Sequence, residues 1–277
     1  MIDCAEKPPI IDGMKQTMFQ AREIFDNIWQ IEEYGVFCYL VAGSERALLI
    51  DMGTGFGDLA EFAAALTPLP VTAAATHAHP DHIGGRGAFK TLCLPQEEFG
   101  LARFYGSLFM RRMMFSKAAQ KTYHTKRSAI RKGKYRTKYL PLKGEERFDL
   151  GGRTVECIRV PGHTKGGMMF LCRAEKLLFT GDDLCRALWL FLPGALSVSE
   201  WAENAERIRP FLSEYTLYSA HDREPQDPAL MKKLIETAHR LVREQKNTLL
   251  PRVRVYPKEY TDHGILYRTD RVRKKRD

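Results

Sequence analysis

The chain has 277 residues, 44% of them hydrophobic, and its 43 Lys or Arg and 34 Asp or Glu give a formal net charge of +9. No run of 18 apolar residues occurs, so we expect no membrane-spanning helix and no membrane partner. The first residues lack the apolar core of a secretory signal, and the six cysteines form no C-x-x-C pair. This pattern predicts a cytoplasmic globular protein with reduced thiols.

A buried strand is predicted for residues 71–75, a short run of apolar and small side chains. The sequence that follows, residues 77–82, reads His-Ala-His-Pro-Asp-His. In layered α/β folds, ligands bind beyond the carboxyl ends of strands. Three histidines and an aspartate within six residues have no ordinary packing role, so this segment predicts a metal site.

Two pairs of ligands can be distinguished in this segment. Extended backbone directs residues i and i+2 to the same side, so His77 and His79 can bind one ion. Pro80 then turns the chain, and a helix that begins near Asp81 would direct Asp81 and His82 to a second ion. Imidazole and carboxylate ligands suit zinc best and also suit iron or manganese. We therefore expect two divalent metal ions, with zinc favoured.

Three further ligand candidates lie at the ends of predicted strands or turns. They are His163 in Pro-Gly-His-Thr, Asp182 in Thr-Gly-Asp and His221 in Ser-Ala-His-Asp. Each would be an ordinary turn residue by itself. A carboxylate can bridge two cations with its two oxygens, which a histidine cannot do, so Asp182 can bridge the ions. Asp183 and Asp222, next to these ligands, are candidates for orienting histidine rings.

A pair of divalent ions that activates water predicts a hydrolase. A hydroxide held between the ions would attack a carbonyl or a phosphorus atom, while Asp182 joins the ions and Asp81 accepts or delivers a proton. The sequence contains no Gly-x-Ser-x-Gly motif for a protein nucleophile. The centre would keep a net positive charge, which favours an anionic small-molecule substrate.

A basic helical insertion is predicted for residues 96–144, before the strand expected at residues 154–160. Residues 99–144 contain thirteen Lys or Arg, and all 34 acidic residues lie outside them. The spacing of five apolar residues in the first part predicts a helix: Leu101, Phe104, Tyr105, Leu108 and Phe109.

Three interpretations of this insertion stay open: a lid over the metal cleft, a contact between copies of the chain, or a solvated basic surface. The basic residues can also contact a phosphate backbone. Only one tyrosine lies among the charges from Lys126 to Arg136, too little for base stacking, so a nucleic-acid partner is not favoured.

The last part of the chain, residues 226–277, predicts a helix and a hairpin. The helix has an apolar stripe that would pack on an outer layer of the fold, and residues 252–256 alternate like a strand. The apolar run at residues 188–193 is either a plug in the core or a wall of the substrate cleft. Because the ligands must converge, residues 1–277 are predicted to form a single domain.

The order of these motifs resembles the metallo-β-lactamase superfamily of hydrolases over residues 30–225. The resemblance includes residues 37–41 and 47–53, which are similar to the family's opening hairpin and first Asp-x-Gly motif. It implies an α/β fold, a four-layer αββα sandwich with the metals at one edge of the two sheets. It also implies that one metal is bound by His77, His79 and His163, the other by Asp81, His82 and His221, with Asp182 bridging and Asp51 supporting.

Differences between this sequence and several branches of the superfamily narrow the range of activities that the resemblance allows. His79 stands where flavin-linked oxygen reductases have glutamate, and Asp182 where many β-lactamases have cysteine. The last ligand lacks the Gly-His-Glu-Tyr context of glyoxalase II, and residues 84–89 are closer to lactonases. The chain therefore resembles the glyoxalase II and lactonase-like branch without matching either. We expect a hydrolase of an ester, lactone or thioester; the alternatives are a phosphodiesterase or nuclease and, third, a non-catalytic metal-binding protein.

Overall fold

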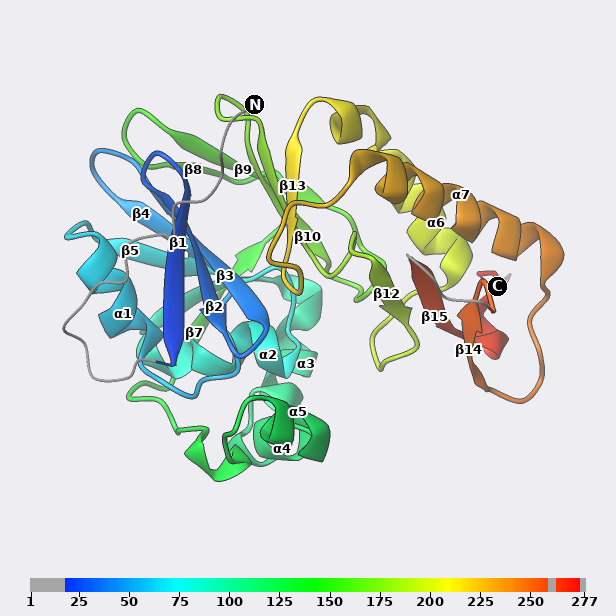
Figure 1. Cartoon of the computed structure of the whole chain (residues 1–277), viewed down its shortest axis with the longest axis horizontal. Helices are drawn as coiled ribbons and strands as arrows, with labels where there is room; N and C mark the ends of the chain where they lie inside the picture. Colours follow the sequence, from blue (N-terminus) through cyan, green and yellow to red (C-terminus); the bar gives the residue numbers. More distant parts are fainter. Residues whose placement is uncertain (1–17, 259–262, 275–277) are drawn as a thin grey trace.

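The apolar runs of the first half of the chain form a seven-stranded sheet whose strands follow one another in chain order (Figure 1). The computed structural model describes residues 18–258 and 263–274. Strands β1 to β4 pair antiparallel, and β4 to β7 pair parallel. The strands are β1 (Phe19–Phe25), β2 (Ile28–Glu33), β3 (Val36–Ala42), β4 (Ala47–Ile50), β5 (Val71–Ala74), β6 (Thr91–Pro95) and β7 (Lys138–Leu142).

The second half of the chain forms a five-stranded sheet in the order β13-β11-β10-β9-β8 and a three-stranded sheet in the order β12-β15-β14. Only the pairs β11–β13 and β12–β15 are parallel. The strands are β8 (Arg147–Asp149), β9 (Thr154–Arg159), β10 (Met168–Cys172), β11 (Leu177–Gly181), β12 (Ala187–Leu190), β13 (Thr216–Ser219), β14 (Val253–Tyr256) and β15 (Gly264–Arg268).

Successive side chains of a strand point to opposite faces of its sheet, and they pack into three separate hydrophobic cores. On β3, Tyr39 packs between the two large sheets together with Phe170, whereas Leu40 packs in the core of the outer helix α1. On β10, Leu171 packs on the opposite side, in the core of α6 and α7. The layers therefore run helix, sheet, sheet, helix, which confirms the four-layer αββα sandwich. The outer helices are α1 (Leu59–Leu66), α6 (Val198–Glu206) and α7 (Pro228–Glu244).

The segment between β6 and β7 contains three short helices instead of one long one. The helix predicted over Leu101 to Phe109 is interrupted, because α3 ends at Tyr105 and Ser107 accepts a hydrogen bond from the N–H of Met110 as N-cap of α4. Phe109 is 73% exposed. The elements here are η2 (Gln96–Glu98), α3 (Phe99–Tyr105), α4 (Leu108–Met114), α5 (Lys117–Thr122) and η3 (Arg127–Ala129).

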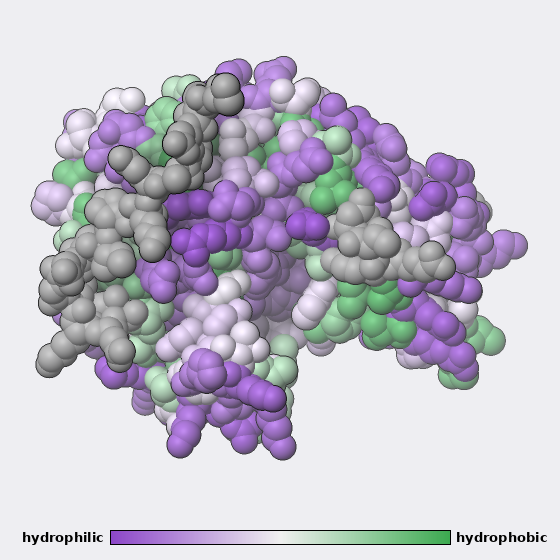
Figure 2. All heavy atoms as spheres, in the orientation of Figure 1, coloured by the Kyte–Doolittle hydropathy of each residue, from purple (hydrophilic) through white to green (hydrophobic). Residues whose placement is uncertain are grey.

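The surface around α4 and α5 is mainly hydrophilic, with single hydrophobic side chains between the charges (Figure 2). The molecule is hollowed between this region and the part that carries β12, β14 and β15 (Figures 1 and 2). The remaining short helices are α2 (Pro80–Ile83), η1 (Gly84–Ala88), η4 (Arg209–Ser213) and η5 (Thr269–Arg271). Among the described residues, every helix is too short or too polar to span a lipid bilayer.

In the C-terminal part, α7 begins after the N-cap Asp227, and it buries Leu234, Ala238 and Leu241 in the core that it shares with the five-stranded sheet. Strands β14 and β15 pair antiparallel. The predicted turn of this hairpin, residues 261–263, lies largely outside the described residues, as do the first and last residues of the chain. Because α7 shares a core with the sheet, we keep the proposal of a single domain.

Candidate metal centre

Chain segments from both large sheets bring the seven predicted ligands together. His77 and His79 follow β5, Asp81 and His82 lie in α2, and His163 lies in the turn between β9 and β10. Asp182 directly follows β11, and His221 comes two residues after β13. Three sets have ligand atoms within 4.8 Å of one another: His77, His79 and His163; His77, His82 and Asp182; Asp81, His82 and His221.

In the first set, three imidazole nitrogens converge. Nδ1 of His79 lies 3.0 Å from Nε2 of His77 and 2.8 Å from Nε2 of His163. Nδ1 of His163 donates a hydrogen bond to the carbonyl oxygen of Trp189 at 2.7 Å, which leaves the lone pair of Nε2 free for a metal. Burial lowers the pKa of all three rings, so they are neutral, the form that binds cations.

In the third set, Asp81, His82 and His221, carboxylates surround two imidazoles. Nδ1 of His82 donates to Asp51 at 2.8 Å, so Nε2 of His82 is directed at Oδ2 of Asp182, 3.5 Å away. Nε2 of His221 lies 3.2 Å from Oδ2 of Asp182 and 3.6 Å from Oδ2 of Asp81. Burial lowers the pKa of His221, but Asp182 outweighs it and raises this pKa to about 9.

Asp182 lies between the first and the third set, the two ligand sets that the resemblance implies. Its Oδ2 is within 3.5 Å of Nε2 of His82, of His163 and of His221. Its Oδ1 is buried and has no hydrogen-bond partner among the described residues, and the same holds for Nε2 of His82. Burying a polar atom without a partner costs free energy. A cation bound here would give a partner to both Oδ1 of Asp182 and Nε2 of His82. This donor set of imidazoles and carboxylates fits two divalent ions that share Asp182.

A family comparison agrees with this geometry. The model of the metallo-beta-lactamase superfamily matches residues 31–231 of the chain. The chain belongs to this superfamily.

Several curated proteins are similar to this chain. It is 30% identical to an acyl-coenzyme A thioesterase, MBLAC2 of Gallus gallus, over 184 residues, which are 61% of this chain and 65% of that protein. It is 26% identical to the atrochrysone carboxyl ACP thioesterase dmxR1 of Cryptosporiopsis sp. over 188 residues, 65% of this chain and 48% of that protein. The chain thus spans less than two thirds of the length of these curated relatives.

Solved structures of the superfamily show the same fold. A metallo-beta-lactamase from Pontibacter korlensis has a TM-score of 0.57 at 18% identity and covers 77% of this chain and 95% of its own. The sec-alkylsulfatase Pisa1 from Pseudomonas sp. has a TM-score of 0.60 at 16% identity, over 81% of this chain and 42% of its own. At these identities the likeness shows the fold alone.

Asp51 connects the first Asp-x-Gly motif to the predicted metal ligands. It directly follows β4 with a positive φ of 61°. Its carboxylate accepts hydrogen bonds from the N–H of Thr76 at 2.8 Å and from the Thr76 hydroxyl, and it contacts His82. One carboxylate therefore fixes the ends of β4 and β5 and the ring of His82, the supporting role that the resemblance implies for Asp51.

The two other acidic neighbours of the ligands do not orient a histidine ring, so that prediction was wrong. Asp183 accepts a hydrogen bond from the backbone N–H of His163 at 2.8 Å and thus fixes the turn. Asp222 accepts from the hydroxyl of Ser219 at 2.9 Å. The carbonyl of Trp189 orients the ring of His163 instead.

Glu98 is a supporting residue that sequence reasoning missed. It is fully buried, and its carboxylate accepts hydrogen bonds from the N–H of Ala78 at 3.1 Å and of Gly166 at 2.8 Å. Ala78 lies between the ligands His77 and His79, and Gly166 follows the turn of His163. The signal in the sequence was slight: Glu98 is the last acidic residue before the long basic stretch.

Replacing Asp51 with asparagine should weaken metal binding by roughly 10- to 100-fold, the usual effect of losing a carboxylate partner of a metal-binding histidine. The amide has only one acceptor oxygen, so it cannot accept from both the Thr76 hydroxyl and the N–H of His82 through separate oxygens as the carboxylate does. Competition with a fluorescent chelator measures the affinity. Asp222→Asn is the matched control, since Asp222 also neighbours a ligand but contacts Ser219, and it should bind metal as the wild type does.

Proposed function

We propose that this chain is a hydrolase that uses two divalent metal ions, and no protein nucleophile, to cleave a thioester of an anionic small molecule. The observation that carries the proposal is Oδ2 of Asp182, which lies within 3.5 Å of imidazoles from both ligand sets. The names of the relatives, thioesterases of coenzyme A and of an acyl carrier protein, favour a thioester over the ester or lactone that the sequence also allowed.

The residues that would hold the ions are the seven predicted ligands, with Asp182 shared between them. Divalent ions in such a site lower the pKa of bound water and stabilise negative charge on a substrate oxygen; zinc fits this donor set best. The side chain of Asp81 is 34% exposed, and its Oδ2 lies 3.6 Å from Nε2 of His221. Asp81 can therefore accept a proton at the solvent side of the centre, which supports its catalytic assignment.

The cysteine three residues after Asp182 is unsuited to act as a nucleophile. Cys185 is buried, and its sulfur contacts the carbonyl oxygens of Asp182 and Ala187 at 3.6 and 3.3 Å. Burial and the charge of Asp182 raise the pKa of this thiol well above its usual range. The chemistry therefore falls to the metal centre, and the free thiols among the described cysteines support the proposal of a cytoplasmic location.

Apolar side chains lie next to the centre and can contact the acyl part of a substrate. The ring of Tyr105 packs against the ligand His79 with centroids 5.1 Å apart, and the adjacent Phe104 is 53% exposed. Trp189, whose carbonyl accepts a hydrogen bond from the ring of His163, is 43% exposed, whereas Leu188 and Leu190 are buried in the core. Leu188 and Leu190 of the apolar run at residues 188–193 thus lie in the core, and we propose that the exposed Trp189 forms part of the cleft wall.

Metal analysis together with a substrate panel tests the proposal. We expect two ions per chain and a clear preference for a thioester over a lactone, an aryl ester, bis-nitrophenyl phosphate and a β-lactam. Treatment with a chelator should abolish turnover, and zinc should restore it. A preference for the phosphodiester would favour the alternative function instead, and fewer than two ions in metal-replete protein would contradict the shared site.

A further inference from the structure

A cavity of about 800 Å³ lies between η1, the α3–α4 junction and the loop of residues 132–137. We call it the cationic cavity. This volume is in the range of small-molecule binding sites. Its wall contains six basic side chains and no acidic one: Arg86, Arg103, Arg111, Lys132, Lys134 and Arg136.

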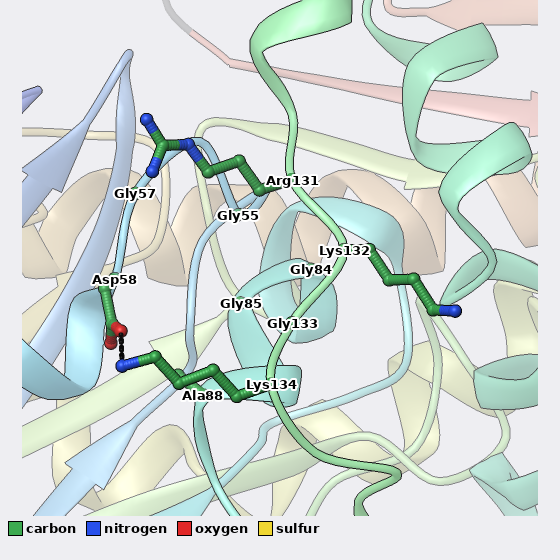
Figure 3. A pocket seen from close by; sticks show the side chains of 10 residues that line it. All are labelled: Gly55, Gly57, Asp58, Gly84, Gly85, Ala88, Arg131, Lys132, Gly133 and Lys134. Atoms are coloured by element: carbon green, nitrogen blue, oxygen red, sulfur yellow. Dashed lines mark ion pairs between the residues drawn. The ribbon is translucent and has the colours of Figure 1, made fainter.

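Most of these charges lack an anionic partner. Lys134 forms an ion pair with Asp58 at 2.7 Å, in a smaller adjoining pocket (Figure 3). Lys132 lines both pockets, and in Figure 3 its side chain extends to the side opposite Arg131. Among the described residues, the salt bridges include none for the other five basic residues of the cavity wall. The cavity therefore concentrates positive charge, most of which has no salt-bridge partner among the described residues.

Two of the guanidinium groups are held in place by neutral oxygens. Arg86 donates to the carbonyl of Ile83 and to the hydroxyl of Tyr139. Arg111 is only 4% exposed and donates to the carbonyls of Thr54 and Arg131 at 3.1 and 2.8 Å. Nε of Arg111 is buried without a hydrogen-bond partner among the described residues. These donors are ordered before any ligand binds, which lowers the entropic cost of binding.

The proximity of these cations is itself unfavourable. Burial, together with the charges of Arg86 and Arg112, lowers the pKa of Arg111 to about 10 against the opposing effect of Glu33. An anion in the cavity would relieve this repulsion. Guanidinium groups bind phosphate oxygens through paired hydrogen bonds, and lysines add point charges, so phosphate groups fit this wall better than a single carboxylate does.

Close backbone packing maintains the cavity. A Cβ atom on Gly133 would lie 2.2 Å from Cα of Gly87, and the N–H of Tyr135 donates to the carbonyl of Gly87 at 2.8 Å. A Cβ atom on Gly106 would lie 2.4 Å from the guanidinium carbon of Arg86. Glycine at these positions lets the basic loop and the α3–α4 junction approach η1 closely.

The cavity adjoins the segments that carry the metal ligands. Gly84, in its wall, comes two residues after the ligand His82. Gly106, also in its wall, directly follows Tyr105, whose ring packs against the ligand His79. A ligand in the cavity is therefore next to the elements that hold the metal centre.

We propose that the cationic cavity binds the phosphate groups of the carrier from which the thioester is cleaved, a small molecule with a diphosphate such as a nucleotide-linked thiol. This inference rests on the proposed function for the identity of the ligand. The number of unpaired cations and the volume of the cavity favour a diphosphate or larger group over a single phosphate.

Two substrates with the same acyl group test the inference: a coenzyme A thioester, which carries phosphates, and a pantetheine thioester, which carries none. The double variant Arg103→Ala/Arg136→Ala removes two exposed side chains of the cavity wall. It should raise KM for the coenzyme A thioester by roughly 10- to 100-fold, because two charge-assisted contacts are lost. KM for the pantetheine thioester and kcat for both substrates should stay within about twofold of the wild type.

The matched control is Lys117→Ala/Lys121→Ala, which removes two exposed charges from the same insertion but outside the cavity wall. It should leave both KM values unchanged. An equal rise of KM for both substrates in the cavity variant, or an equal rise with the control variant, would overturn the inference.

A direct binding measurement separates this inference from the proposed function. Calorimetry with adenosine diphosphate should show binding to the metal-loaded wild type and to the control variant, and binding at least tenfold weaker to the cavity variant. This result without any thioester turnover would keep the cavity as a diphosphate site and refute the thioesterase proposal. Thioester turnover with equal diphosphate binding by all three proteins would refute the cavity and leave the proposed function standing.

Discussion

Replacing Asp182 with alanine should lower thioester turnover by roughly 10³-fold, because each ion contributes several kcal/mol of charge stabilisation in such centres. We also expect the bound metal to fall from two ions per chain to one or fewer. Oδ2 of Asp182 lies 3.2 Å from Nε2 of His221 and 3.5 Å from Nε2 of His82 and of His163. Its loss removes the side chain that reaches both ligand sets. Elemental analysis and steady-state kinetics measure the two effects.

The neighbouring Asp183 supplies a matched control. Burial raises its pKa well above the usual range of an aspartate, which favours the neutral form of its side chain. Asparagine reproduces that neutral group and can still accept the hydrogen bond from the N–H of His163. Asp183→Asn should therefore keep both ions and most of the turnover. Two ions and full turnover in Asp182→Ala would remove the bridging assignment.

The local part of the site could be predicted from the sequence because short-range geometry determines it. Residues 77–82 combine an extended stretch, a proline turn and a helix start, and α2 begins at Pro80, close to the predicted position. The spacing of His77 and His79 then requires no knowledge of the tertiary structure. For His163, Asp182 and His221 the residues themselves indicate only turns, and their ligand roles came from the order of the motifs and the family resemblance.

Supporting contacts through the backbone could not be predicted. The carbonyl of Trp189 fixes the ring of His163, but every residue has a carbonyl, so no residue type indicates this contact. The break between α3 and α4 has a similar cause. The apolar spacing continues across Gly106, while Ser107 begins a new helix through its N-cap hydrogen bond. The sequence showed the basic charge of the insertion but not the cavity, which depends on how the 132–137 loop packs on η1.

Replacing Glu98 with alanine should destabilise the fold by about 2–6 kcal/mol, because two buried backbone donors would lose their partner at about 1–3 kcal/mol each. These donors are the N–H groups of Ala78 and Gly166. Chemical denaturation of the metal-free protein measures this change. Glu97→Ala is the matched control: Glu97 forms a partly exposed ion pair with Arg159, and its loss should cost no more than about 1 kcal/mol.

Metal affinity decides whether Glu98 supports the site or only the fold. Ala78 separates two ligands, and Gly166 follows the turn that carries His163, so Glu98 holds together the two segments of the first ligand set. Without this carboxylate, metal binding would have to order those segments, and the free energy of that ordering would weaken the observed affinity for the metal. We therefore expect Glu98→Ala to bind zinc at least tenfold more weakly at temperatures where it is fully folded. Wild-type affinity in the folded variant would limit the role of Glu98 to stability.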